Sequence, residues 1–300
     1  MGHYKTILED IRKGNNSIAQ VIIDIAYISL VPASPLRRWQ RAFQVMLDKG
    51  KGRLVNNLRI IQFVEADLNM VLNTIWGTRL IRQAKHSSAL DDSQYALPGQ
   101  TCPNTVMNKV LFLDLSRQTL TSGVLTDFGA SAALDRVLGS LSVLTCERVG
   151  LPRTAGHFMY SLLKNMNNNL ITGFRTSTDS FNNSENGETG QGVLQGSSSA
   201  APIYILTSDI SLSTYKKSGI GATFIHPITK KTITKKAVQF VDDTSQFLNE
   251  LGTLNTSAWA CTNDSKERLY NASKNNLKTW TESMWTSGGN LNVDKCYYFA

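Results

Sequence analysis

Residues 239–244 of the chain read Gln239-Phe240-Val241-Asp242-Asp243-Thr244. Apolar runs flank the two acids, so the pattern predicts a β-hairpin with Asp242 and Asp243 at its tip. Adjacent carboxylates in a tight turn repel each other. A divalent cation such as Mg²⁺, which prefers oxygen ligands, relieves that repulsion. A solvated Asp-Asp turn is the alternative interpretation, because this dipeptide is common in proteins.

A second informative stretch, residues 192–202, lies upstream and contains Gln195-Gly196-Ser197 before a final Ala201-Pro202. Together the two stretches resemble the palm of the reverse transcriptase family, where a Gln-Gly-Ser segment ending in a small residue and proline precedes an x-x-Asp-Asp hairpin. A Gly/Ser linker fits less well, because an apolar run follows at once. The resemblance implies that Gln195, Gly196 and Ser197 lie under the incoming nucleotide and the templating base, where glycine permits close approach.

Further short motifs keep the order of that family along residues 35–300. Leu58-Arg59-Ile60-Ile61 resembles the fingers motif that opens with arginine, and residues 69–82 resemble the helix that follows this motif. Residues 95–114 resemble the segment that leads into the palm. The end of the first palm motif is similar to Ala133-Leu134-Asp135-Arg136-Val137, and a later palm segment with a lysine is similar to residues 288–296. The chain also shows a particular likeness to retroelement reverse transcriptases of the algal and diatom type, in the pattern around Asp135-Arg136 and residues 288–296. Each motif is short, and the order and spacing make the resemblance specific.

Four more side chains receive roles from the resemblance. Leu134 would lie against the sugar of the incoming nucleotide, and Lys295 would donate a proton to the pyrophosphate leaving group. Asn69 stands where related elements often carry lysine, so Arg59 and Arg79 are expected to supply charge toward phosphates, with Arg82 as the alternative. For Leu134 and Lys295, a core leucine and a surface lysine are the alternatives.

The first palm motif departs from the family at one position. The family's remaining metal ligand lies six residues before the aspartate of this motif, and counting back from Asp135 reaches Gly129, which has no side chain. Asp127 lies two residues earlier and on the same face of a strand, about 6.5–7 Å away along it. Two hypotheses remain open. A slip or bulge near Gly129 brings Asp127 into place as a ligand, or the site has lost one carboxylate.

Composition limits the functional class. The chain has 300 residues, 41% of them hydrophobic, with a net charge of +8 that suits a polyanionic partner. The four cysteines form no CxxC pair, which argues against a zinc ribbon and favours free thiols in a reducing compartment. We therefore expect an intracellular protein, nuclear or cytoplasmic and not secreted. The apolar run at residues 18–31 holds Asp24 and is too short to span a membrane, so no membrane partner is expected.

Helical and strand patterns are mixed without βαβ regularity, so the expected class is α+β. The resemblance implies a right-hand polymerase: an N-terminal extension at residues 1–34, a fingers-like region at 35–118, and a palm at 119–300 with inserted fingers helices at about 139–168. The palm would carry the Asp-Asp hairpin on an antiparallel sheet. A thumb would follow residue 300 and is missing, so a fragment is expected. Residues 35–90 are predicted to be helical.

The sequence thus predicts an RNA-directed DNA polymerase that uses an RNA template, a DNA primer, dNTPs and two Mg²⁺ ions. Asp127, Asp242 and Asp243 would be the metal ligands, and Lys295 would complete the catalytic set. A second hypothesis is a nucleic-acid-binding remnant that has lost the chemistry. An RNA-templated RNA polymerase is less consistent, because those enzymes typically place glycine before the Asp pair. The sequence gives no oligomeric state.

Overall fold

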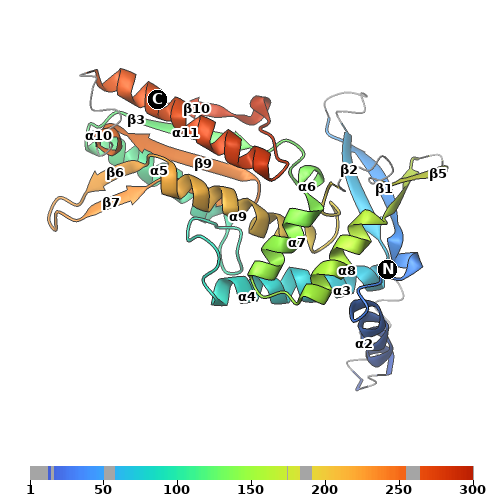
Figure 1. Ribbon diagram of the computed structural model, residues 1–300. Helices are drawn as coiled ribbons and strands as arrows, with labels where there is room; N and C mark the ends of the chain where they lie inside the picture. Colours follow the sequence, from blue (N-terminus) through green and yellow to red (C-terminus); the bar gives the residue numbers. More distant parts are fainter. Residues whose placement is uncertain are drawn as a thin grey trace.

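The computed structural model describes residues 13–14, 17–50, 58–173, 175–182, 191–254 and 264–299. Helices and strands are mixed, as expected for the α+β class, and within these ranges the strands form two four-stranded sheets and a small hairpin. Figure 1 shows the two larger sheets at opposite ends of the molecule, with helices between them. We call the sheet that contains residues 237–240 and 243–249 the palm-like sheet, and the sheet that contains residues 41–48 and 58–64 the fingers-like sheet.

The palm-like sheet has the order β10-β3-β9-β8, and every pairing in it is antiparallel. Its strands are β10 (Tyr297–Phe299), β3 (Gly123–Gly129), β9 (Asp243–Asn249) and β8 (Ala237–Phe240). The predicted hairpin that ends in Asp242 and Asp243 is confirmed, and Asp127 and Gly129 lie on one strand, β3, as expected.

Helices cover both faces of the palm-like sheet (Figure 1). On one face, α5 (Cys102–Gln118) brings Phe112 against Leu125 and Phe247. On the other, α9 (Ala200–Ser218) and α11 (Ser265–Thr286) pack around Phe128 and Trp280. Side chains alternate between the two faces of a strand, so Leu125 and Phe128 of β3 point to opposite faces of the sheet. Both faces of β3 are therefore covered by helices.

The fingers-like sheet corrects one expectation. Its order is β2-β1-β4-β5, with β2 (Leu58–Val64), β1 (Arg41–Asp48), β4 (Asn167–Ile171) and β5 (Thr176–Asn182). The prediction that residues 35–90 are helical is therefore wrong for β1 and β2. The strand signal was hidden because buried positions are polar: Gln62 donates from Nε2 to Asn168 Oδ1 at 3.0 Å, inside the sheet.

The remaining elements connect and cover these sheets. They are α2 (Ser17–Leu30), η1 (Arg37–Gln40), α3 (Ala66–Leu72), the π-helical η3 (Asn73–Arg79), α4 (Leu80–His86), α6 (Ala133–Arg136), α7 (Gly139–Arg148), α8 (Arg153–Lys164), β6 (Ala222–Ile225), β7 (Thr232–Lys235), α10 (Glu250–Leu254) and η5 (Val293–Lys295). The largest core cluster joins α3, η3, α8 and α9, where Trp76 stacks on Phe158 with ring centroids 6.0 Å apart.

Within the described residues, no helix has the length and apolar character needed to cross a bilayer. Cys102, Cys146 and Cys296 are free thiols, as expected, whereas Cys261 lies outside the described residues.

Candidate active site

The candidate site is centred on the turn between β8 and β9. Phe240 pairs with Asp243, so Val241 and Asp242 form a two-residue loop. Val241 has a φ of +56°, which is the type II′ arrangement usually reserved for glycine. A β-branched residue held there costs about 1–3 kcal/mol, so the surrounding contacts must hold this turn in place.

Strand β3 brings the first palm motif beside this turn. The β3–β9 pairing runs without a break, with Gly129 opposite Asp243 and Asp127 opposite Ser245. The slip or bulge that would move Asp127 to the position of Gly129 is therefore absent from β3. Asp127 and Asp243 nevertheless lie on one face of the sheet. Asp127 is directly opposite Ser245, paired residues point the same way, and Ser245 and Asp243 are two positions apart on β9.

Two lysines surround these acids. Lys109 on α5 lies with Nζ 2.9 Å from Asp127 Oδ1 and donates to Asp127 Oδ2 at 3.0 Å. Lys295 on η5 lies over Gly129, where a Cβ added to the glycine would be 3.0 Å from the Cβ and Cδ atoms of the lysine. The aliphatic stem of Lys295 thus occupies the space above Gly129.

The electrostatics of Asp243 show that these groups act on one another. Desolvation and the neighbouring Asp242 carboxylate raise the pKa of Asp243, Asp127 adds to this, and Lys295 and Lys109 oppose it. Burial together with Asp242 and Asp243 also raises the pKa of the Tyr204 hydroxyl, so this α9 side chain lies near the turn. The sequence reasoning missed Lys109 and Tyr204, because both come close to the acids only in the folded chain.

The acids fit a cation in part. Among the residues that the structure describes, no group of three or more His, Cys, Asp or Glu side chains is arranged to hold a metal ion. Asp242 and Asp243 provide a pair of carboxylates, which suits an ion that takes its other ligands from water and phosphate. Asp127 lies two residues before Gly129, the residue opposite Asp243, and it forms an ion pair with Lys109. The two Mg²⁺ ions stay a prediction.

The Gln195–Ser197 segment packs against the fingers-like sheet. Gln195 accepts from the backbone N–H of Gln62 at 2.6 Å, and its side-chain amide can donate to Ile60 O at 3.2 Å and to Asp135 Oδ2 at 3.1 Å. Gly196 has a φ of +116°, and a Cβ there would be 2.5 Å from Gln62 O. Glycine is required because the segment touches the backbone of β2.

The next residues of this segment meet the helix after the fingers motif. Ser198 donates through its backbone N–H and its hydroxyl to Asn69 Oδ1, at 3.0 and 2.9 Å. Ser197 shares a 2.9 Å hydrogen bond with Ser199. Asn69, where the resemblance led us to expect lysine, therefore joins α3 to residues 195–199, which we call the Gly/Ser segment.

The other predicted site residues surround the segment at different depths. Leu134 on α6 is half-buried against the main core, and its carbonyl accepts from Val193 N at 2.9 Å. Arg59 on β2 and Arg79 at the end of η3 are both exposed. The structure thus brings Leu134 and Gln195 into one neighbourhood, while the roles given to Arg59 and Arg79 stay predictions.

The fold is similar to that of a solved telomerase, apo telomerase from Candida tropicalis truncated from its C-terminal domain. The TM-score is 0.53 at 11% sequence identity, over 87% of this chain and 50% of that chain, so the chain spans half the length of that telomerase. A scan against protein-family models gives no match, and no curated protein matches significantly.

This likeness shows the fold, and function has to be argued from the site. The likeness extends over most of the chain, so the mixed helix-and-strand fold is the property that it shares with that telomerase. The Asp242–Asp243 turn lies at the end of the palm-like sheet, and Val241 packs against the core cluster that includes Val193 and Leu194.

Proposed function

We propose that the chain is the RNA-directed DNA polymerase domain of a retroelement, which extends a DNA primer on an RNA template with dNTPs. The observation that carries this proposal is the Asp242–Asp243 turn, held at the end of β8 and β9 in a polymerase-like fold. The net charge of +8 is consistent with polyanionic partners.

Asp242 and Asp243 would hold Mg²⁺, and Asp127 would join them only after its ion pair with Lys109 opens and β3 slips by two residues toward the turn. When bound, the ions would neutralise the carboxylates and stabilise the charge of the nucleotide phosphates. Lys295, within electrostatic reach of Asp243, would donate a proton to the pyrophosphate. Leu134 and the Gln195–Ser197 segment would orient the nucleotide and the templating base.

Primer extension on an RNA template with dNTPs and Mg²⁺ tests this proposal. Wild type should extend, and Asp242→Asn should lower the rate by about 100-fold or more, because a metal ion contributes several kcal/mol to such a reaction. Asp114→Asn is the matched control, since this acid is exposed on α5. Equal extension by wild type and Asp242→Asn would refute the role of the turn.

A second candidate is a nucleic-acid-binding remnant without polymerase activity. It is favoured by the β3 geometry, because Gly129 lies under Lys295 and Asp127 is held by Lys109. This candidate predicts salt-dependent binding of primer–template without extension. It also predicts that Gly129→Asp increases divalent-cation affinity, provided that the flexible Lys295 stem moves by a few tenths of an ångström.

A further inference from the structure

A connecting stretch between α4 and α5, residues 91–96, lies along the outer edge of β8. Gln94 and Gln239 form a parallel bridge. Gln239 donates through its backbone N–H to Ser93 O at 2.8 Å, and its carbonyl accepts from Tyr95 N at 2.8 Å. The stretch therefore satisfies the outer backbone groups of Gln239, three residues before Asp242, and protects β8 as a further strand would.

The buried side chains of Gln94 and Gln239 also connect the 91–96 stretch to β8. Gln94 Nε2 donates to Gln239 Oε1 at 3.1 Å, and Gln94 Oε1 accepts from Ala96 N at 3.0 Å. Both glutamines are at most 2% exposed. A buried amide pair of this kind specifies one register, because any shift leaves polar groups without partners.

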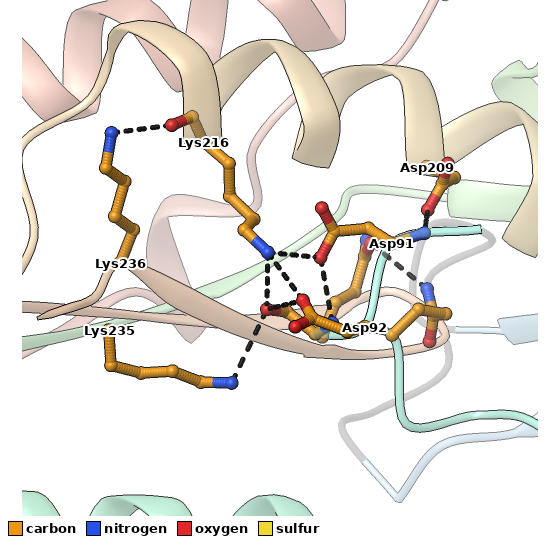
Figure 2. A network of polar contacts seen from close by, with 9 residues as sticks. Asp91, Asp92, Asp209, Lys216, Lys235 and Lys236 are labelled. Atoms are coloured by element: carbon orange, nitrogen blue, oxygen red, sulfur yellow. Dashed lines mark hydrogen bonds and ion pairs between the residues drawn. The ribbon is translucent and has the colours of Figure 1, made fainter. Parts of the chain in front are cut away.

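Lys216 on α9 holds the beginning of the same stretch. Its Nζ lies 2.7 Å from Asp91 Oδ1, 2.6 Å from Asp92 Oδ1 and 3.2 Å from Ser93 Oγ. Figure 2 shows this ammonium group facing both carboxylates, with Asp209 on the other side of Asp91. Asp209 accepts from Asp91 N at 2.9 Å, so α9 contacts the stretch through two side chains.

Two further lysines complete the network (Figure 2). Lys236 donates to the backbone carbonyl of Lys216 at 2.6 Å, and Lys235 donates to Ser93 Oγ at 3.4 Å. The contacts with Lys216 lower the pKa of Asp92 to about 2. The network thus links α9, the 91–96 stretch and the chain that enters β8.

We propose that Lys216 is a positioning residue for the Asp242–Asp243 turn, and that it acts by clamping residues 91–96 against β8. The role in the reaction rests on the function proposed above. Val241 at the turn holds a strained backbone conformation, and strain of this kind persists only where neighbouring contacts over-determine it. The clamp supplies such contacts on the one edge of β8 that β9 does not cover.

Amide hydrogen exchange of the intact chain tests the clamp without any need for activity. In Lys216→Met, exchange at Gln239, whose N–H donates to Ser93, should become about tenfold faster, which corresponds to about 1.4 kcal/mol. Lys216→Arg should restore slow exchange because it keeps the charge. Lys217→Met is the matched control, since this neighbour is exposed. Should Lys216→Met fold poorly, Asp92→Asn removes one contact and should give a smaller change of the same sign.

Primer extension by the same variants separates the two proposals. If wild type extends, Lys216→Met should lower kcat while the KM for dNTPs stays the same, because the turn and not the nucleotide pocket is displaced. Faster exchange at Gln239 in a chain that never extends a primer would keep the clamp and refute the polymerase function. Unchanged exchange at Gln239, or an equal increase at Thr126 in β3, would overturn the clamp.

Discussion

Replacing Gly196 by alanine measures how closely the Gly/Ser segment approaches β2. A non-glycine residue in this backbone conformation costs about 1–3 kcal/mol. The added Cβ would also be 2.5 Å from Gln62 O and 2.9 Å from Ile61 Cγ2. Relieving that overlap requires backbone movement, which costs about another 1–3 kcal/mol. We therefore expect Gly196→Ala to lower the free energy of unfolding by about 2–6 kcal/mol.

Urea denaturation followed by tryptophan fluorescence is the assay. With an m-value of about 3 kcal/mol per molar, the midpoint should fall by roughly 0.7–2 M. Two controls separate the causes. Gly50 has a φ of +72° with open space around it, so Gly50→Ala reports backbone strain alone, and Gly173→Ala, with open space and no positive φ, reports neither effect. If Gly196→Ala loses no more stability than Gly50→Ala, the close approach to β2 is refuted.

Three other predictions concern charge and thiols. Lys109→Met should tighten Mn²⁺ binding, measured by electron paramagnetic resonance, by about fivefold, because removing a unit charge near carboxylates is worth about 1 kcal/mol; unchanged affinity would exclude Asp127 from the cation site. The pKa of Asp92 is depressed to about 2, so its contribution to stability is present above about pH 4 and is lost as pH falls toward 2; acid titration of urea midpoints should show a smaller loss in Asp92→Asn, and identical curves would contradict this. Burial raises the pKa of Cys146 to about 12, whereas Cys102 is exposed; peptide mapping after brief N-ethylmaleimide treatment should find Cys102 labelled and Cys146 unlabelled, and the reverse order would show that α7 opens readily.

The palm-like sheet could be predicted from the sequence because its signals are local. Apolar runs flank the Asp-Asp turn, and β8 and β9 lie where that pattern indicates. The fingers-like sheet could not, because its burial is inverted: Gln44 and Gln62 are buried while Phe43 and Phe63 are exposed. A pattern search that expects apolar residues inside a sheet misses such strands.

The candidate site was predictable only where neighbours in sequence form it. Asp242 and Asp243 are adjacent, and so are Gln195 and Gly196. The ion pair of Lys109 with Asp127 and the clamp of Lys216 on Asp91 join distant parts of the chain, so no spacing along the sequence announces them. The absence of a bulge in β3 likewise depends on its register with β9, which only the paired strands define.

The parallel pairing of β1 with β4 has a consequence for synthesis of the chain. Arg41 pairs with Asn167, so the fingers-like sheet cannot close until the whole of α5, β3, α7 and α8 has emerged from the ribosome. Until then β1 and β2 form a lone hairpin with an open edge, which is marginally stable and prone to pair with other chains. Contacts so distant in sequence form slowly. Nascent chains that stop before β4 are therefore the species that we expect to aggregate or to need chaperones.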